Sequence, residues 1–199
     1  MQLSVVIVSY NAVPFLELCL HSVVKAIENL DAEIIVVDNL STDDTCQRIQ
    51  EKFKDVKLIA NTSNLGFATA NNLGVLEANG DYVLILNPDT VVAEDTFINC
   101  LAFADNTKNL GALGVKLIDG GGYYLPESKR NFPTPLVTFY KMLGVKSQKH
   151  AYYAKHVSEN DTGKVAVLVG AFMFLKRDTY LFVKGFDTDY FMYGEDIDL

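Results

Sequence analysis

Cysteine is scarce in this sequence, whose 199 residues contain three: Cys19, Cys46 and Cys100. Their number is odd and their spacing wide, and no Cys-x-x-Cys pair is present that could chelate zinc or carry out redox chemistry. Thiols of this kind are typical of a reducing compartment. We therefore expect reduced cysteines in a cytoplasmic protein.

Basic residues are also few. The chain has 17 Lys and Arg against 25 Asp and Glu, which gives a net charge of -8 and a pI near 4.8. Neutralising the phosphates of a nucleic acid requires clustered Lys and Arg, and the sequence has no such cluster. We expect no nucleic-acid partner.

Long apolar segments are absent as well. The longest run, 165–175, is shorter than the roughly 20 residues that a membrane-spanning helix needs. The start, "MQLSVVIVSYN", lacks the basic region and small-residue cleavage site of a signal peptide, so its apolar run is better interpreted as a first strand. We expect no transmembrane segment. Peripheral association with the inner face of the cell membrane stays open.

What the sequence does contain is an alternation of strand and helix patterns. Apolar runs predict strands, and segments with apolar residues at helical spacing predict helices between them. The predicted strands are 3–10, 32–39, 56–61, 81–86 and 110–118, and the predicted helices are 13–27, 41–53, 66–78 and 93–106. This alternation predicts an α/β fold, Rossmann-like, with a mostly parallel central sheet flanked by helices.

The alternation stops at residue 119 and returns near 165, with a strand and the start of a helix. The segment 118–164 is rich in Gly, Pro and Tyr and predicts an irregular insertion, either a binding loop or a surface excursion. Two of its features stay open. Lys129 and Arg130 could contact a phosphate or be solvated, and the pairs Tyr123-Tyr124 and Tyr152-Tyr153 could stack on sugar rings or cover a sheet edge.

Polar residues collect where the predicted strands end. In an open α/β sheet, ligands bind beyond the carboxyl ends of the strands. Asn11 or the residues after Asp38 could instead belong to turns and helix caps. Four clusters on one sheet edge favour a binding site, and they are Ser9-Tyr10-Asn11, Asp38-Asn39, Asn61 with Asn64, and Asn87-Pro88-Asp89.

The last cluster has the chemistry of a metal site. Pro88 disfavours the helical region for Asn87, so the Asp89 carboxylate is presented just past the strand end. An ordinary β-turn explains the same residues. Mg²⁺ or Mn²⁺ prefers carboxylates and the oxygens of a bound diphosphate, and one or two protein carboxylates suffice.

Five motifs together resemble the family 2 glycosyltransferases of the GT-A fold, closest to the rhamnosyltransferase-like members. They are "SVVIVSYN", "IIVVDNLSTDDT", "NLGFATANNLG", "LILNPDT" and "GAFMFLKRDTYLFVKGFDTDYFMYGEDIDL". The resemblance covers 3–117 and 165–199. It implies one GT-A catalytic domain over 1–199, with a nucleotide-sugar-binding half at 1–117 and an acceptor-side strand and acidic motif at 165–199.

The resemblance also implies roles for single residues. Asp89 matches the metal-binding Asp-x-Asp position, with a departure, because Asn87 stands in place of the first aspartate. Asp196 in "GEDIDL" matches the catalytic base of inverting members. The nucleotide-sugar-binding positions are matched by Ser9, Tyr10, Asn11, Asp38, Asn64, Gly66, Asn71 and Asn87.

The implied function is an inverting, metal-dependent transfer in polysaccharide biosynthesis, with Mg²⁺ or Mn²⁺ as cofactor. The donor would be dTDP-rhamnose or a UDP-hexose, and the acceptor a glycan or a lipid-linked glycan. A sugar-1-phosphate nucleotidyltransferase is one alternative, although the Gly-rich, Arg-containing signature expected after the first strand is missing. A catalytically inactive nucleotide-sugar-binding domain is another. Relatives continue beyond the acidic motif, so we expect a truncated chain in which donor binding can survive while transfer activity is weak or absent.

Overall fold

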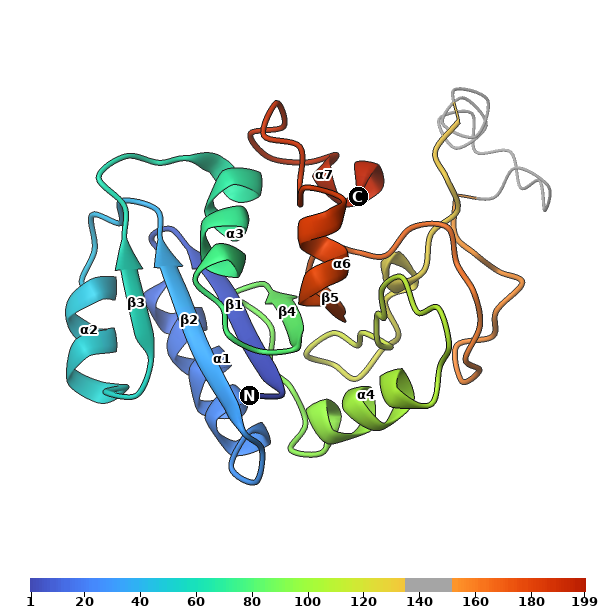
Figure 1. Cartoon of the computed structure of the whole chain (residues 1–199), viewed down its shortest axis with the longest axis horizontal. Coiled ribbons are helices and arrows are strands. Elements are labelled where there is room, and N and C mark those ends of the chain that lie inside the picture. Colours follow the sequence, from blue (N-terminus) through green and yellow to red (C-terminus); the bar gives the residue numbers. More distant parts are fainter. Residues whose placement is uncertain (135–151) are drawn as a thin grey trace. The chain divides into compact units, whose positions relative to one another are not determined.

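The computed structural model describes residues 1–134 and 152–199 (Figure 1). These residues form two compact units. The first unit comprises Met1–Leu113 and Gly170–Leu199, and the second comprises Gly114–Val169. The segment 118–164, predicted to be an insertion, lies inside the second unit; the functional division of the chain stays a prediction.

The first unit contains all the strands and all the α-helices of the described chain. Their order is β1 Leu3–Ser9, α1 Val13–Ala26, β2 Ala32–Asp38, α2 Thr45–Lys52, β3 Lys57–Ala60, α3 Gly66–Leu76, β4 Tyr82–Leu86, α4 Thr96–Asp105, β5 Phe172–Lys176, α6 Arg177–Phe182 and α7 Glu195–Asp198.

The strands form one five-stranded sheet in the order β3-β2-β1-β4-β5. β1 pairs in parallel with both β2 and β4, β2 pairs in parallel with β3, and β5 runs antiparallel to β4. Every residue of β1 and β4 is buried, as expected for strands covered on both faces. The prediction of a mostly parallel α/β sheet is confirmed.

Helices cover both faces of this sheet. Figure 1 shows α3 in front of the sheet and α1 behind it. α3 approaches closely because it carries Gly74, where an added Cβ would collide with the side chains of Val6 and Val37. This contact fixes α3 against the centre of the sheet, with its first turn near the carboxyl ends of the strands.

The predicted strand 110–118 is wrong. Among the described residues this segment makes two isolated bridges, Leu113 to Phe174 and Ile118 to Tyr124. None of its residues is buried, so it lacks the continuous apolar contact that a strand inside the sheet would have. The returning strand is also shorter than 165–175, since β5 begins at Phe172.

The second unit is mostly irregular, with one short 3₁₀ helix at Pro126–Ser128. Its basic side chains hold its loops together. The Lys129 Nζ donates to the carbonyl oxygens of Val157 at 2.7 Å and Ser158 at 2.5 Å, and Arg130 Nη2 donates to the Leu168 carbonyl at 2.7 Å. The solvated alternative for Lys129 and Arg130 is therefore wrong. No helix in the described ranges is long and apolar enough to cross a membrane.

Candidate active site

The parallel pairing brings the ends of β1 and β2 together. Ser9 lies opposite Asp38 in the register, and the backbone N–H of Asn39 donates to the Ser9 carbonyl at 2.8 Å. Ser9 and Asp38 are both buried. Tyr10, the next residue after β1, is about half exposed and is free to contact a ligand.

Asn11 ties the loop after β1 to the loop after β2. Its Oδ1 accepts the Thr42 backbone N–H at 2.7 Å, and its own N–H donates to Ser41 Oγ at 2.9 Å. Asn11 adopts a positive φ of 50°, and the cap of α1 is Ala12, which makes no side-chain cap bond. The capping alternative for Asn11 is wrong, and α2 starts at Thr45 instead of 41 because residues 41 and 42 are engaged with Asn11.

Asp38 is a buried carboxylate at the same edge. Its Oδ2 accepts the Ser41 backbone N–H at 2.9 Å. Burial, followed by the neighbouring Asp38 carboxylate, raises the pKa of the Cys46 thiol to about 11. A buried carboxylate that accepts a backbone N–H is held in a fixed orientation. Its contact with a base or ribose stays a prediction.

Asn39 is a hydrogen-bonding hub at a predicted strand end, although it is not among the predicted site residues. Its Nδ2 donates to the Gly66 carbonyl at 3.0 Å, and its Oδ1 accepts Asn61 Nδ2 at 2.9 Å and the Leu65 N–H at 3.4 Å. One buried amide thereby holds the segment 61–66 against the end of β2. Its position directly after Asp38 was the available signal.

The start of α3 is shaped by Gly66, which adopts a φ of +77°. Asn64 Oδ1 accepts the Gly66 N–H at 3.0 Å, and an added Cβ at Gly66 would collide with the backbone of Phe191. Asn71 is fully buried and donates through Nδ2 to the Phe67 carbonyl at 2.9 Å. Within the described part of the chain, the buried Asn71 Oδ1 has no hydrogen-bond partner, and neither has Ser9 Oγ.

The turn after β4 presents Asp89. The Thr90 N–H donates to the Asn87 carbonyl at 3.2 Å, so the predicted β-turn is present. The Asn87 N–H donates to the Ala171 carbonyl at 3.1 Å, which joins this turn to the residue before β5. Asp89 is exposed, and within residues 1–134 and 152–199 its carboxylate makes no hydrogen bond or ion pair.

The described residues gather no group of three or more His, Cys, Asp or Glu side chains that could hold a metal ion. A site built by protein ligands alone does not fit them. An exposed carboxylate on a rigid turn does fit a cation that is carried mainly by the phosphates of a ligand. The role of Asp89 as the protein ligand stays a prediction.

Asp196 lies in α7, whose first turn follows Gly194 with a φ of 104°. Its Oδ2 accepts the Gly170 N–H at 3.1 Å. Gly170 directly precedes Ala171, the residue bonded to Asn87. The turn of Asp89 and the carboxylate of Asp196 are thus attached to two consecutive residues, which brings together the two acidic positions predicted from distant motifs.

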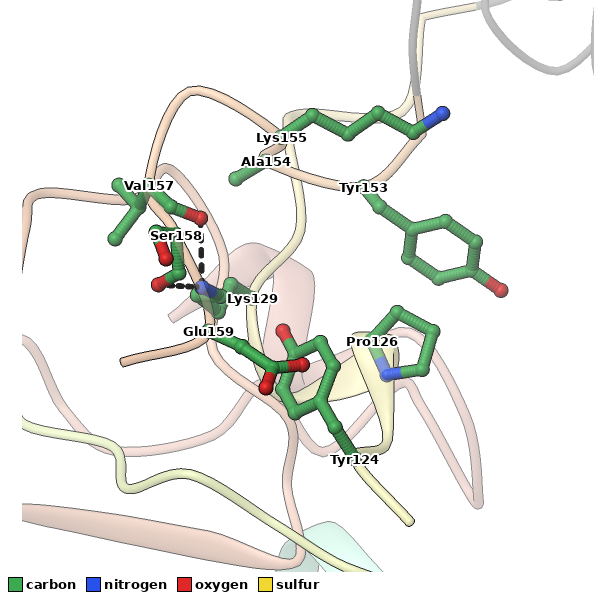
Figure 2. Close-up of a pocket in the computed structure, with 9 residues that line it drawn as sticks. All are labelled: Tyr124, Pro126, Lys129, Tyr153, Ala154, Lys155, Val157, Ser158 and Glu159. Atoms are coloured by element: carbon green, nitrogen blue, oxygen red, sulfur yellow. Dashed lines mark hydrogen bonds between the residues drawn. The ribbon is translucent and has the colours of Figure 1, made fainter. Parts of the chain in front are cut away.

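The second unit has a cavity of its own, of about 410 Å³. Figure 2 shows the rings of Tyr124, Pro126 and Tyr153 on one side and Lys129 with Val157 on the other. The Lys129 ammonium lies over the Tyr124 ring, 5.3 Å from the ring centroid, in a cation–π contact. No residue predicted for the site lines this cavity.

Comparison with known proteins identifies the family and the fold. Residues 4–181 match the family model described as glycosyl transferase family 2. The N-acetylglucosaminyl-diphospho-decaprenol L-rhamnosyltransferase of Mycobacterium tuberculosis is 31% identical over 212 residues, covering 99% of this chain and 68% of that protein. Rhamnosyltransferase WbbL of Escherichia coli K12 is 32% identical over 122 residues, covering 60% of this chain and 44% of that protein.

Two solved structures share the fold. S. aureus TarS 1-349 in complex with UDP has a TM-score of 0.71 at 20% identity, covering 99% of this chain and 53% of that chain. The mannosyltransferase PcManGT from Pyrobaculum calidifontis, in complex with GDP-Man and Mn²⁺, has a TM-score of 0.68 at 25% identity, with coverages of 98% and 49%. The chain therefore spans about half the length of these two solved proteins.

Proposed function

The chain belongs to glycosyl transferase family 2, and we propose that it transfers a sugar from a nucleoside-diphosphate donor to a hydroxyl of a glycan or lipid-linked acceptor. The observation that carries the proposal is the pair of bonds at Gly170 and Ala171. They attach the turn of Asp89 and the carboxylate of Asp196 to neighbouring backbone groups. Such a transfer requires a carboxylate that acts at the donor diphosphate, here Asp89, and a group that accepts the proton of the acceptor hydroxyl, here Asp196.

The nucleotide would lie across the carboxyl ends of β1 and β2 and the start of α3. Ser9, Tyr10, Asn11, Asp38, Asn64, Gly66, Asn71 and Asn87 are the proposed contacts. Three of them support the assignment, because buried polar atoms in proteins are nearly always hydrogen-bonded. Ser9 Oγ, Asp38 Oδ1 and Asn71 Oδ1 are buried without a hydrogen-bond partner among the described residues, and a ligand can supply one.

Asp89, together with the donor phosphates, would hold a divalent cation, Mg²⁺ or Mn²⁺, and such a cation would supply stabilisation of the charge on the leaving diphosphate. Asn87 contributes to this end of the site through its backbone, which fixes the turn. The proposal gains support from PcManGT, a structural relative whose structure contains GDP-Man and Mn²⁺.

Asp196 would accept the proton of the acceptor hydroxyl as that oxygen attacks the anomeric carbon. General-base catalysis requires the base within hydrogen-bond reach of the attacking oxygen. The Gly170 N–H occupies Oδ2 of Asp196 and orients the carboxylate. A single displacement from the face opposite the leaving group inverts the anomeric centre, through a transition state of oxocarbenium character.

For the donor we propose dTDP-rhamnose, with a UDP-hexose as the second choice. The support is that two relatives are named rhamnosyltransferases. The mycobacterial relative is named for an N-acetylglucosaminyl-diphospho-decaprenol acceptor. A lipid-linked acceptor of that class would place the reaction at the cytoplasmic face of a membrane.

The test is a transfer assay with Asp196→Asn and, as its matched control, Asp198→Asn on the same short helix. We expect Asp196→Asn to bind the donor with nearly unchanged affinity and to lose turnover by about two orders of magnitude or more, while the control keeps its rate. Wild-type turnover of Asp196→Asn would exclude it as the base. Release of pyrophosphate from a nucleoside triphosphate and a sugar-1-phosphate would instead identify a nucleotidyltransferase.

A further inference from the structure

Asn72 on α3 binds both backbone groups of Phe186, a residue 114 positions away in the sequence. Its Nδ2 donates to the Phe186 carbonyl at 2.8 Å, and its Oδ1 accepts the Phe186 N–H at 3.0 Å. A side-chain amide that pairs with an N–H and a C=O of the same residue fixes that residue in both position and orientation.

Two neighbours reinforce this clamp. The Tyr180 hydroxyl donates to the same Oδ1 of Asn72 at 2.5 Å, and its ring packs edge-on against Phe186 with 5.7 Å between centroids. Gly185, with a φ of +70°, has no space for a side chain, since an added Cβ would lie 2.7 Å from the Tyr180 ring. The backbone before Phe186 is therefore shaped to meet Asn72.

The segment that follows Phe186 leads to the acidic motif and is held by α3 a second time. The Phe67 N–H donates to the Phe191 carbonyl at 2.8 Å, and the bare Gly66 accommodates the Phe191 backbone. Residues 187–193 are themselves exposed. Because these residues contribute little burial, the attachments to α3 help to fix their path toward Asp196, whose carboxylate is held separately by the Gly170 N–H.

We propose that Asn72 is a positioning residue, which clamps Phe186 to α3 and thereby holds the segment that carries Asp196. The same helix begins at the proposed donor contact Gly66, two residues after Asn64. Its role in catalysis rests on the proposed function, in which Asp196 is the base. Its role in fixing the segment rests on the hydrogen bonds alone.

The first test is amide hydrogen exchange without any ligand, comparing the wild-type chain with Asn72→Ala. We expect exchange in 186–198 to accelerate by about tenfold or more, while β1 and β2 keep their rates. Asn99→Ala is the matched control, since Asn99 is exposed on α4 and bonds to Asp95 of the same helix. Equal exchange of 186–198 in Asn72→Ala and wild type would overturn the proposal, and so would a uniform acceleration that includes β1 and β2.

Asn72→Asp is the second variant, in case the alanine variant does not fold. It keeps the size of the side chain but turns the donor into an oxygen that faces the Phe186 carbonyl. We expect the same local acceleration in 186–198. Unchanged exchange in this variant would count against the clamp.

The second test separates positioning from binding. In Asn72→Ala we expect kcat to fall by about tenfold or more while the affinity for the donor nucleotide stays within about twofold. A fall in kcat without faster exchange of 186–198 would overturn positioning as the cause. If Asp196→Asn turns over at the wild-type rate, the proposed function of Asp196 fails, and the exchange experiment still decides the role of Asn72 in fixing the segment.

Discussion

The Gly170 backbone N–H donates to Oδ2 of Asp196 at 3.1 Å. This bond joins a residue just before β5 to the acidic helix α7. The carbonyl oxygen of the next residue, Ala171, accepts a hydrogen bond from the Asn87 N–H. The two residues that lead into the edge strand therefore bond to the turn of Asp89 and to the carboxylate of Asp196. The antiparallel direction of β5 makes this arrangement, because its first residues meet the carboxyl end of β4.

Replacing Asp89 with Asn should remove the effect of metal on nucleotide binding. The change keeps the shape of the side chain and removes its charge, and a neutral amide is a poor ligand for Mg²⁺ or Mn²⁺. We expect the stabilisation by nucleotide with Mn²⁺ to fall to the level seen with EDTA. Thermal unfolding measures it, with the exposed Asp55→Asn as control. A shift of wild-type size in Asp89→Asn would remove Asp89 from the metal site.

Asn39→Ala should destabilise the first unit by about 2 to 4 kcal/mol, because three bonds are lost and a buried carbonyl at Gly66 is left unsatisfied. Urea unfolding measures the change in the free energy of unfolding. Asn99→Ala, in which an exposed local bond to Asp95 is removed, should cost about 0.5 kcal/mol or less. A cost for Asn39→Ala as small as that of the control would show that the hub is dispensable.

Gly66→Ala should cost about 1 to 3 kcal/mol, since residue 66 has a φ of +77° and its missing side chain leaves room for the backbone of Phe191. Gly111→Ala is the matched control, because an added Cβ there would meet nothing within 4 Å. Denaturant unfolding of both variants gives the comparison. Equal free energies of unfolding for the two variants would contradict the close contact at Gly66.

Cys19 should resist alkylation while the chain is folded. Burial, and then the nearby Asp89 carboxylate, raise the pKa of its thiol from 9.0 to about 12. The folded pKa lies above the unfolded one, so the stabilisation linked to this group is full below about pH 9 and is lost as the pH rises toward 12. At pH 8 we expect iodoacetamide to label Cys19 only after unfolding in urea. Rapid labelling of the folded chain would contradict the buried, protonated thiol.

Much of the fold could be predicted from the sequence, for physical reasons visible in particular elements. β1 and β4 are continuous apolar runs, and such runs are typical of strands buried on both faces. The segment 110–118 is also apolar in places, but it contains two glycines and pairs with no strand continuously. Its apolar pattern therefore gave the wrong prediction of a strand. The antiparallel direction of β5 has no signature in the sequence, because it depends on where the chain re-enters the sheet.

The candidate site was likewise predictable from the sequence only in part. The strand-end rule placed Ser9 and Asp38 at one edge, and the register confirms that they lie opposite each other. The place of Asn39 at a strand end was visible in the sequence, but its partners and the clamp at Asn72 were not. These partners are distant in sequence, and an asparagine has the same signature in a turn as in a buried network. The roles assigned to single residues in catalysis and nucleotide binding stay predictions.

The most direct test of the account is thermal unfolding of this chain with dTDP, UDP and GDP, each with Mn²⁺ and again with EDTA. A ligand at about 100 times its dissociation constant adds roughly 2.7 kcal/mol of stability. The account predicts that one nucleotide raises the midpoint of thermal unfolding in the presence of Mn²⁺, and that EDTA abolishes the rise. We expect dTDP to be that nucleotide, with UDP as the second choice. Identical midpoints with every nucleotide, or a rise that EDTA leaves unchanged, would contradict a metal-assisted donor site at Asp89.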